Sequence, residues 1–103
     1  MEKKMVQSIL SAAFAAPVVP VRASGCGRVY VSISSSDKAL VNAVSAAAKA
    51  MGKIFQRKGY MGMRNVLYIG YDNASGRELA KGEAIAAYLS ANGIPAYMDA
   101  QGD

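Results

Sequence analysis

The sequence contains no histidine, no tryptophan and only one cysteine, Cys26. An internal disulfide is therefore excluded, and so is a Cys/His zinc site within one chain, because such a site needs three or four nitrogen or sulfur ligands. No run approaches the roughly 18 apolar residues of a membrane-spanning helix, so we expect no membrane span. A lone thiol is typical of a reducing compartment, and we predict a cytoplasmic protein that holds no metal and no cofactor.

Catalytic side chains are equally scarce. Cys26 lies in the turn-forming stretch Ser24-Gly25-Cys26-Gly27, with no histidine anywhere in the chain to act as its base. A nucleophilic cysteine needs such a partner or another means of activation. A free, unreactive thiol is the simpler interpretation, and we predict a protein that is not an enzyme.

Length and charge indicate one basic domain. The 103 residues are enough for a single core and too few for two. The net charge of +5 is unevenly spread, because residues 1–71 carry +8 and residues 72–103 carry −3. A basic body with an acidic end is typical of contact with a polyanion, and it equally fits head-to-tail self-association.

The first residues predict an amphipathic helix over 1–16 that ends at Pro17. Its apolar side chains recur at helical spacing and form one stripe: Met5, Val6, Ile9, Leu10, Ala13 and Phe14. A secretory signal has a similar pattern of early lysines and an apolar middle. Glu2, Gln7, Ser8, Pro17 and Pro20 interrupt that pattern, so we favour the helix.

The remaining elements alternate between strands and helices. Val29, Val31 and Ile33 alternate with polar residues, which predicts a strand with one buried face. Gly59 is expected to end the long alanine-rich helix, and Ser75 with Glu78 forms an S-x-x-E capping box. The predicted elements are a β-hairpin over 18–34, a helix over 37–58, a strand over 65–71, a helix over 75–91 and a strand over 94–98.

The order α-β-β-α-β-α-β predicts a single small α/β domain. Strands that are joined by helices should run parallel through right-handed crossovers. The strand that contains Pro20 should be antiparallel and should lie at an edge or contain a bulge, because proline has no backbone N–H to donate. We therefore predict a mixed four-stranded sheet with three parallel strands and with the helices packed on it.

The ends of the predicted parallel strands form one candidate site. Ligands gather outside the carboxyl ends of such strands, and helix N-termini there favour a phosphate. Carboxylates of Asp37, Asp72 and Asp99 could instead hold Mg²⁺. Ordinary helix capping and loop chemistry explain several of the same residues. The candidate ligand-binding residues are Ser36, Asp72, Asn73, Ser75, Gly76 and Arg77, with Lys38 as an added charge.

A basic stripe forms the second candidate site. Six basic residues and no acid lie between Lys38 and Tyr71. Lys49, Lys53 and Arg57 would form one line along a helix, where like charges repel. A surface that keeps such repulsion is typical of a nucleic-acid interface, although solvation alone also explains it. The predicted nucleic-acid-binding residues are Lys49, Lys53, Arg57, Lys58 and Arg64.

Tyrosines and methionines leave two further questions open. Tyr30, Tyr68 and Tyr97 would stack on bases if they shared an open sheet face with Arg28. We favour the alternative that the N-terminal helix covers that face and makes the tyrosines core, because sheets of this class are covered on both sides. The cluster Met51, Tyr60, Met61 and Met63 is typical of an adaptable protein interface, which makes a homodimer plausible.

The sequence thus favours a small basic, non-enzymatic binding module. Nucleic acid is the first predicted partner, through the Lys/Arg stripe. A protein partner or self-association in an accessory or regulatory role is the alternative. A small phosphate-containing ligand in the loop after the strand over 65–71 is the third possibility.

Overall fold

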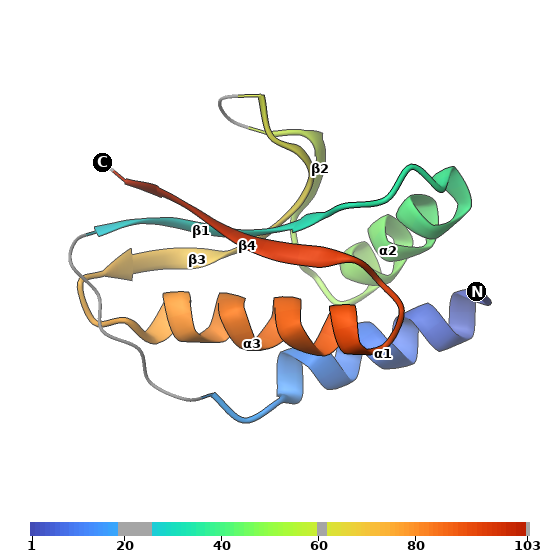
Figure 1. Ribbon diagram of the computed structural model, residues 1–103, viewed down its shortest axis with the longest axis horizontal. Coiled ribbons are helices and arrows are strands. Elements are labelled where there is room, and N and C mark those ends of the chain that lie inside the picture. The colour runs from blue at the N-terminus through green and yellow to red at the C-terminus, as the bar shows by residue number, and fades with distance from the viewer. Residues whose placement is uncertain (19–25, 60–61, 103) are drawn as a thin grey trace.

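Three helices and four strands make up the part of the chain that the computed structural model describes, which is residues 1–18, 26–59 and 62–102. Within those ranges no helix combines the length and apolar character needed to cross a membrane. In chain order (Figure 1) the elements are α1 (Lys3–Ala15), β1 (Cys26–Ile33), α2 (Lys38–Ala50), β2 (Phe55–Lys58), β3 (Arg64–Asn73), α3 (Arg77–Ala91) and β4 (Ala96–Gly102).

The strands form one sheet in the order β2-β3-β1-β4, and every neighbouring pair is antiparallel. The prediction of three parallel strands is therefore wrong. β3 and β4, which α3 connects, run in the same direction, but β1 lies between them and is antiparallel to both. β3 separates β1 from β2 in the same way. This is the split β-α-β-β-α-β arrangement, in which each helical crossover skips one strand.

The error in strand direction comes from β2, which lies inside the helix predicted over 37–58. α2 ends at Ala50, and Gly52 has a φ of 73°, a left-handed conformation that glycine adopts at low cost. The chain then reverses into β2, which pairs with β3 through Phe55 and Leu67. This extra hairpin turns β3 around relative to β1.

Other boundaries differ by smaller amounts. The strand expected at an edge over 18–23 lies outside the described residues except for Val18, which is not in a strand. β1, the second strand of the hairpin predicted over 18–34, is central in the sheet, and β4 is at an edge. The helix predicted over 1–16 corresponds to α1, the strand over 65–71 to β3, the helix over 75–91 to α3 and the strand over 94–98 to β4.

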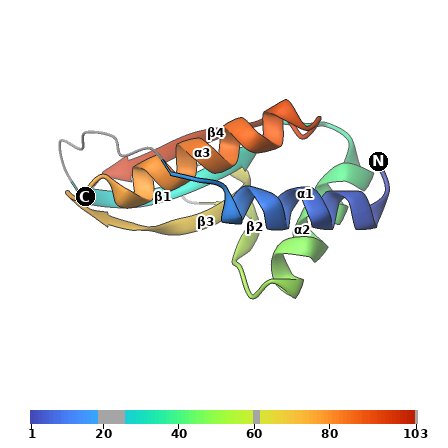
Figure 2. The same cartoon turned by 90° about the horizontal axis from the view of Figure 1, so that it is seen from below.

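The helices form a layer on one side of the sheet. α3 lies against one face of the sheet, α1 lies on the same side and packs on the other two helices, and α2 lies beyond the ends of the strands (Figures 1 and 2). α1 packs against both α2 and α3. Val31, Ile33 and Leu67 from the strands join apolar side chains of all three helices in one core cluster. β2 rises on the opposite side of the sheet from α3 (Figure 1).

α3 approaches the sheet closely because of Gly82. A Cβ atom at Gly82 would lie 2.7 Å from Cγ1 of Val29 and 2.9 Å from Cγ of Met98. Both contacts are shorter than van der Waals separation, so this position suits only a residue without a side chain. The same contacts identify Val29 and Met98 as facing the helices, and they fix which side chains of β1 and β4 face the other way.

Candidate functional site

The loop after β3 is organised around the carboxylate of Asp72. Asp72 is 2% exposed and accepts hydrogen bonds from the backbone N–H groups of Gly76 at 3.0 Å, Glu78 at 2.9 Å and Leu79 at 3.1 Å. Burial acts to raise the pKa of this carboxyl, but the backbone donors around it bring the pKa below its ordinary value of 3.8. The carboxylate thus fills the N-terminus of α3, where we predicted a phosphate.

The predicted capping box is replaced by this arrangement. Gly76, with a φ of 78°, is the N-cap residue of α3 and has no side chain to contribute. The Ser75 hydroxyl accepts from the backbone N–H of Arg77 at 3.3 Å, and Glu78 has a buried oxygen without a hydrogen-bond partner among the described residues. Asn73 and Arg77 are exposed at the edge of the loop. Asp72 therefore stabilises the start of α3 in place of the predicted capping box.

Antiparallel pairing also separates the residues that we expected to converge. Cys26 pairs with Asn73, whereas Ser32 pairs with Val66, so Ser36 and Asp72 lie toward opposite ends of the β1–β3 pair. Asp37 caps α2 by accepting from the N–H groups of Ala39 and Leu40. Over the described ranges, no three acidic, cysteine or histidine side chains are grouped as a metal site requires.

The predicted basic stripe is divided between two parts of the molecule. Lys49 is in the last turn of α2, and Lys53 lies beyond it with its ammonium 4.7 Å from the Phe14 ring centroid. Arg57 donates to Oδ1 of Asn42 at 2.7 Å and also lies over the Phe55 ring. Lys58 and Arg64 are exposed, opposite each other in the β2–β3 hairpin. The stripe is therefore not a line along one helix.

The tyrosines lie on the sheet face opposite the helices, and we call this the tyrosine face. Tyr30 follows Val29, which faces α3, and its ring lies 5.6 Å from that of Tyr68 in an edge-to-face arrangement. Tyr97 pairs with Ser32, two residues along β1 from Tyr30. The interpretation that α1 covers these tyrosines is wrong, because α1 packs against α2 and α3 on the other side. The expectation that the tyrosines are core residues is confirmed for Tyr30 and is wrong for Tyr97.

Exposure varies across the tyrosine face. Tyr30 is 6% exposed, Tyr68 is half-buried, and Tyr97 is 54% exposed. Arg28 is exposed on the same face, where it pairs with Tyr71 of β3. The residue opposite Tyr30 on β4 is Asp99, which is partly buried. Tyr97 is thus the most accessible ring of the three that the sequence singled out.

A polar depression of about 580 Å³ opens beside Tyr97. It brings together Arg64 of the predicted basic stripe, Ser36 of the predicted loop site and Tyr97 of the tyrosine set. No sequence pattern singled out Asn65, which also contributes to it and has a left-handed φ of 54°. The full lining is Ser32, Ile33, Ser34, Ser35, Ser36, Gly62, Met63, Arg64, Asn65 and Tyr97.

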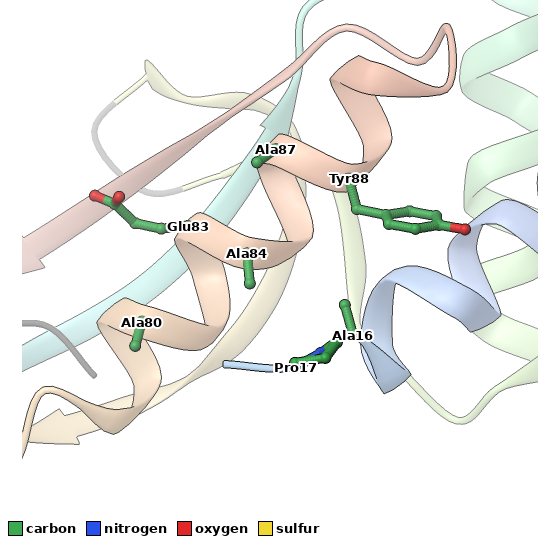
Figure 3. Close-up of a pocket in the computed structure, with 7 residues that line it drawn as sticks. All are labelled: Ala16, Pro17, Ala80, Glu83, Ala84, Ala87 and Tyr88. Carbon is green, nitrogen blue, oxygen red and sulfur yellow. The ribbon is translucent and has the colours of Figure 1, made fainter. Parts of the chain in front are cut away.

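A second hollow, of about 500 Å³, lies between the end of α1 and the outer side of α3. Figure 3 shows Ala80, Ala84 and Ala87 along α3, with the Tyr88 ring directed toward α1 and the Glu83 carboxylate directed away from Ala16 and Pro17. Alanine methyl groups cannot orient a polar ligand. Of the two hollows, the depression beside Tyr97 has the chemistry of a binding site.

No family model, curated protein or solved structure matches this chain. Its function must therefore be argued from the site, since the same fold can carry many unrelated functions. The methionine and tyrosine cluster contributes little to that argument, because Tyr60 and Met61 lie outside the described residues.

Proposed function

We propose that this protein binds single-stranded nucleic acid on the tyrosine face. The observation that carries the proposal is that Tyr97, which is 54% exposed, lies with Arg28 and the Tyr30–Tyr68 pair on the face of the sheet opposite α3. Aromatic side chains on an antiparallel sheet are a common platform for unstacked bases, and they tolerate different sequences because every base has a π-face.

The different exposures of the three tyrosines indicate where a nucleic-acid strand would contact the protein. The Tyr97 ring is accessible for stacking, whereas Tyr30 and Tyr68 support each other in an edge-to-face pair. Asp99, opposite Tyr30, can accept a hydrogen bond from a base amino group. The bases of a duplex stack on one another and offer no free face to Tyr97, so this surface suits a single strand better.

Charge around the tyrosine face supports the same proposal. Arg28, Lys58 and Arg64 are exposed, and within the described ranges none has an acidic side chain in an ion pair. Lys53 and Arg57, which face aromatic rings on the helical side, are less suited to phosphate contact than we predicted. The proposed interface therefore keeps Lys58 and Arg64 from the stripe and adds Arg28. A binding role in the cytoplasm, without catalysis, remains part of the proposal.

Stacking on Tyr97 gives the first test. We expect fluorescence anisotropy to show binding of a labelled single-stranded oligonucleotide at about 50 mM salt, where phosphate contacts are strong. Tyr97→Ala should weaken binding by roughly 5-fold to 150-fold, because stacking on an aromatic contributes about 1–3 kcal/mol per base. Tyr97→Phe keeps the ring and should bind nearly as the parent does. The absence of any binding at this salt concentration would refute the proposal.

Salt dependence gives the second test. Replacing Lys58 or Arg64 with alanine should weaken binding to all single strands and reduce the slope of log affinity against log salt by about 0.7 per phosphate contact. Lys4 is the matched control, since it is exposed on α1, on the helical side. Lys4→Ala should leave the slope at its parent value. An equal change in all three variants would mean that only net charge matters.

Self-association is the second candidate function. The hollow between α1 and α3 in Figure 3 favours it, because small side chains let another surface approach closely. Light scattering as a function of protein concentration measures it directly. The hollow lies on the helical side, so self-association there and nucleic-acid binding on the tyrosine face are compatible.

A further inference from the structure

The depression beside Tyr97 differs in chemistry from the rest of the tyrosine face. Three consecutive serines, Ser34 to Ser36, leave β1 and lead to the Asp37 cap of α2. Asn65 approaches from the start of β3, and Tyr97 lies across β1 from it on β4. Hydroxyl and amide groups from two separate segments thus line the same depression as one exposed ring.

Several of these polar groups remain able to bind a ligand. The hydroxyl of Ser32 donates to the carbonyl of Arg64 at 3.0 Å, and the Ser35 hydroxyl accepts from the N–H of Asp37 at 3.1 Å. By contrast, no hydrogen bond links the side chain of Ser36 or Asn65 to another described residue. Ser36 is exposed and Asn65 is partly buried in the wall of the depression.

The backbone at Asn65 is itself unusual. Its φ of 54° lies in the left-handed region, which most side chains avoid and which asparagine tolerates better than most. The position is within β3, where extended conformation is the rule. Residues held in sparsely populated conformations are concentrated at functional sites. This conformation brings Asn65 into the same depression as Arg64, its neighbour in the chain.

We propose that the depression binds one nucleotide of the strand as a ribonucleotide and so selects RNA over DNA. The base stacks on Tyr97, and the phosphate contacts the guanidinium of Arg64. The ribose 2′-hydroxyl exchanges hydrogen bonds with the Ser36 hydroxyl and the Asn65 amide, which can each donate and accept. The 2′-hydroxyl is the group by which a protein distinguishes RNA from DNA at a given position. The volume of about 580 Å³ is within the range of small-ligand sites. This inference rests on the proposed function.

The test compares two oligonucleotides that differ only in the 2′-hydroxyl, oligouridine and oligodeoxyuridine. With the parent protein, we expect oligouridine to bind roughly tenfold more tightly, as two modest hydrogen bonds would give. Asn65→Gly removes the amide while keeping the left-handed backbone accessible, and Ser36→Ala removes an exposed hydroxyl. Each should reduce the RNA-to-DNA affinity ratio to about threefold, and the double variant should bring it near one.

Ser8→Ala is the matched control, because Ser8 is exposed on α1, on the helical side of the sheet and away from the depression. Its RNA-to-DNA ratio should equal that of the parent. Equal binding of the two oligonucleotides by the parent would overturn this inference and leave the proposed function standing. A preference for RNA that persists in the double variant would also overturn it. Failure of both oligonucleotides to bind would overturn the proposed function and this inference together.

Discussion

Asp72→Ala is expected to lower the melting temperature by about 10 °C, because it removes the side chain that accepts hydrogen bonds from the N-terminus of α3. The carboxylate accepts from three backbone N–H groups, at Gly76, Glu78 and Leu79, and alanine would leave these buried or partly buried donors without it. Asp72→Asn keeps one acceptor oxygen but loses the charge, so its melting temperature should be intermediate. Thermal unfolding followed by circular dichroism measures all three proteins.

The same carboxylate should give an acid-dependent loss of stability. Its folded-state pKa is lower than the ordinary value of 3.8, because backbone donors favour the charged form. A lowered pKa means that its contribution is fully present above pH 3.8 and is lost as the pH falls through the folded-state pKa. The difference in melting temperature between parent and Asp72→Ala should therefore shrink in acid. A difference that stayed constant down to low pH would contradict this explanation.

Asp37 provides the matched comparison for Asp72. It also caps a helix, accepting from Ala39 and Leu40, but it is exposed to water. Asp37→Ala should therefore lower the melting temperature less than Asp72→Ala, because the donors of α2 can find water instead. If the two variants were equally destabilised, burial would not be the source of the large effect at Asp72.

The capping of α3 illustrates how far local sequence patterns reach. Ser75 and Glu78 have the spacing of a capping box, and the helix does begin within two residues of them. The side chain that accepts the first-turn donors is nevertheless Asp72, which belongs to the preceding strand. The capping-box spacing describes only one turn of a helix, whereas the contact of Asp72 with α3 depends on how β3 and α3 pack together. The phosphate site predicted there used the same free donors that Asp72 occupies.

Strand direction could not be predicted because β2 has almost no sequence signal. Phe55-Gln56-Arg57-Lys58 lacks apolar alternation, and Lys49, Lys53 and Arg57 have helical spacing by coincidence. Gly52 was the available signal, since a glycine after an alanine-rich helix is a common C-terminal stop. Strand β1 was easier to predict, because Val29, Val31 and Ile33 alternate with polar residues and are all buried. Its pattern predicts a face but not which neighbours it pairs with.

Whether the tyrosines are covered depends on which face of the sheet α1 packs against, and the sequence does not specify that face. An amphipathic stripe predicts that a helix buries one side, and either face of the sheet would satisfy that need. Once α1 packs with α2 and α3, Tyr30, Tyr68 and Tyr97 are left on the other face. Ser36, Arg64 and Tyr97 then meet in one depression, although the sequence placed them in three separate sets. Predicting that these three residues lie together would have required the antiparallel strand order β2-β3-β1-β4.

Docking of α1 on the helical side also gives the last prediction. Leu10 is fully buried and belongs to the core cluster that includes Val44 of α2 and Leu89 of α3. Leu10→Ala should reduce the free energy of unfolding by about 2–5 kcal/mol, because it removes buried methyl groups and leaves a cavity. Urea denaturation measures this loss directly, and it would be a large part of the roughly 5–15 kcal/mol of a typical domain.

Met5 on the same helix supplies the control, since its side chain is 53% exposed. Met5→Ala should change the free energy of unfolding by less than about 0.5 kcal/mol. If α1 only lay loosely on the surface, the two variants would be equally mild. A large effect at Leu10 alone would show that α1 is part of the core cluster with α2 and α3.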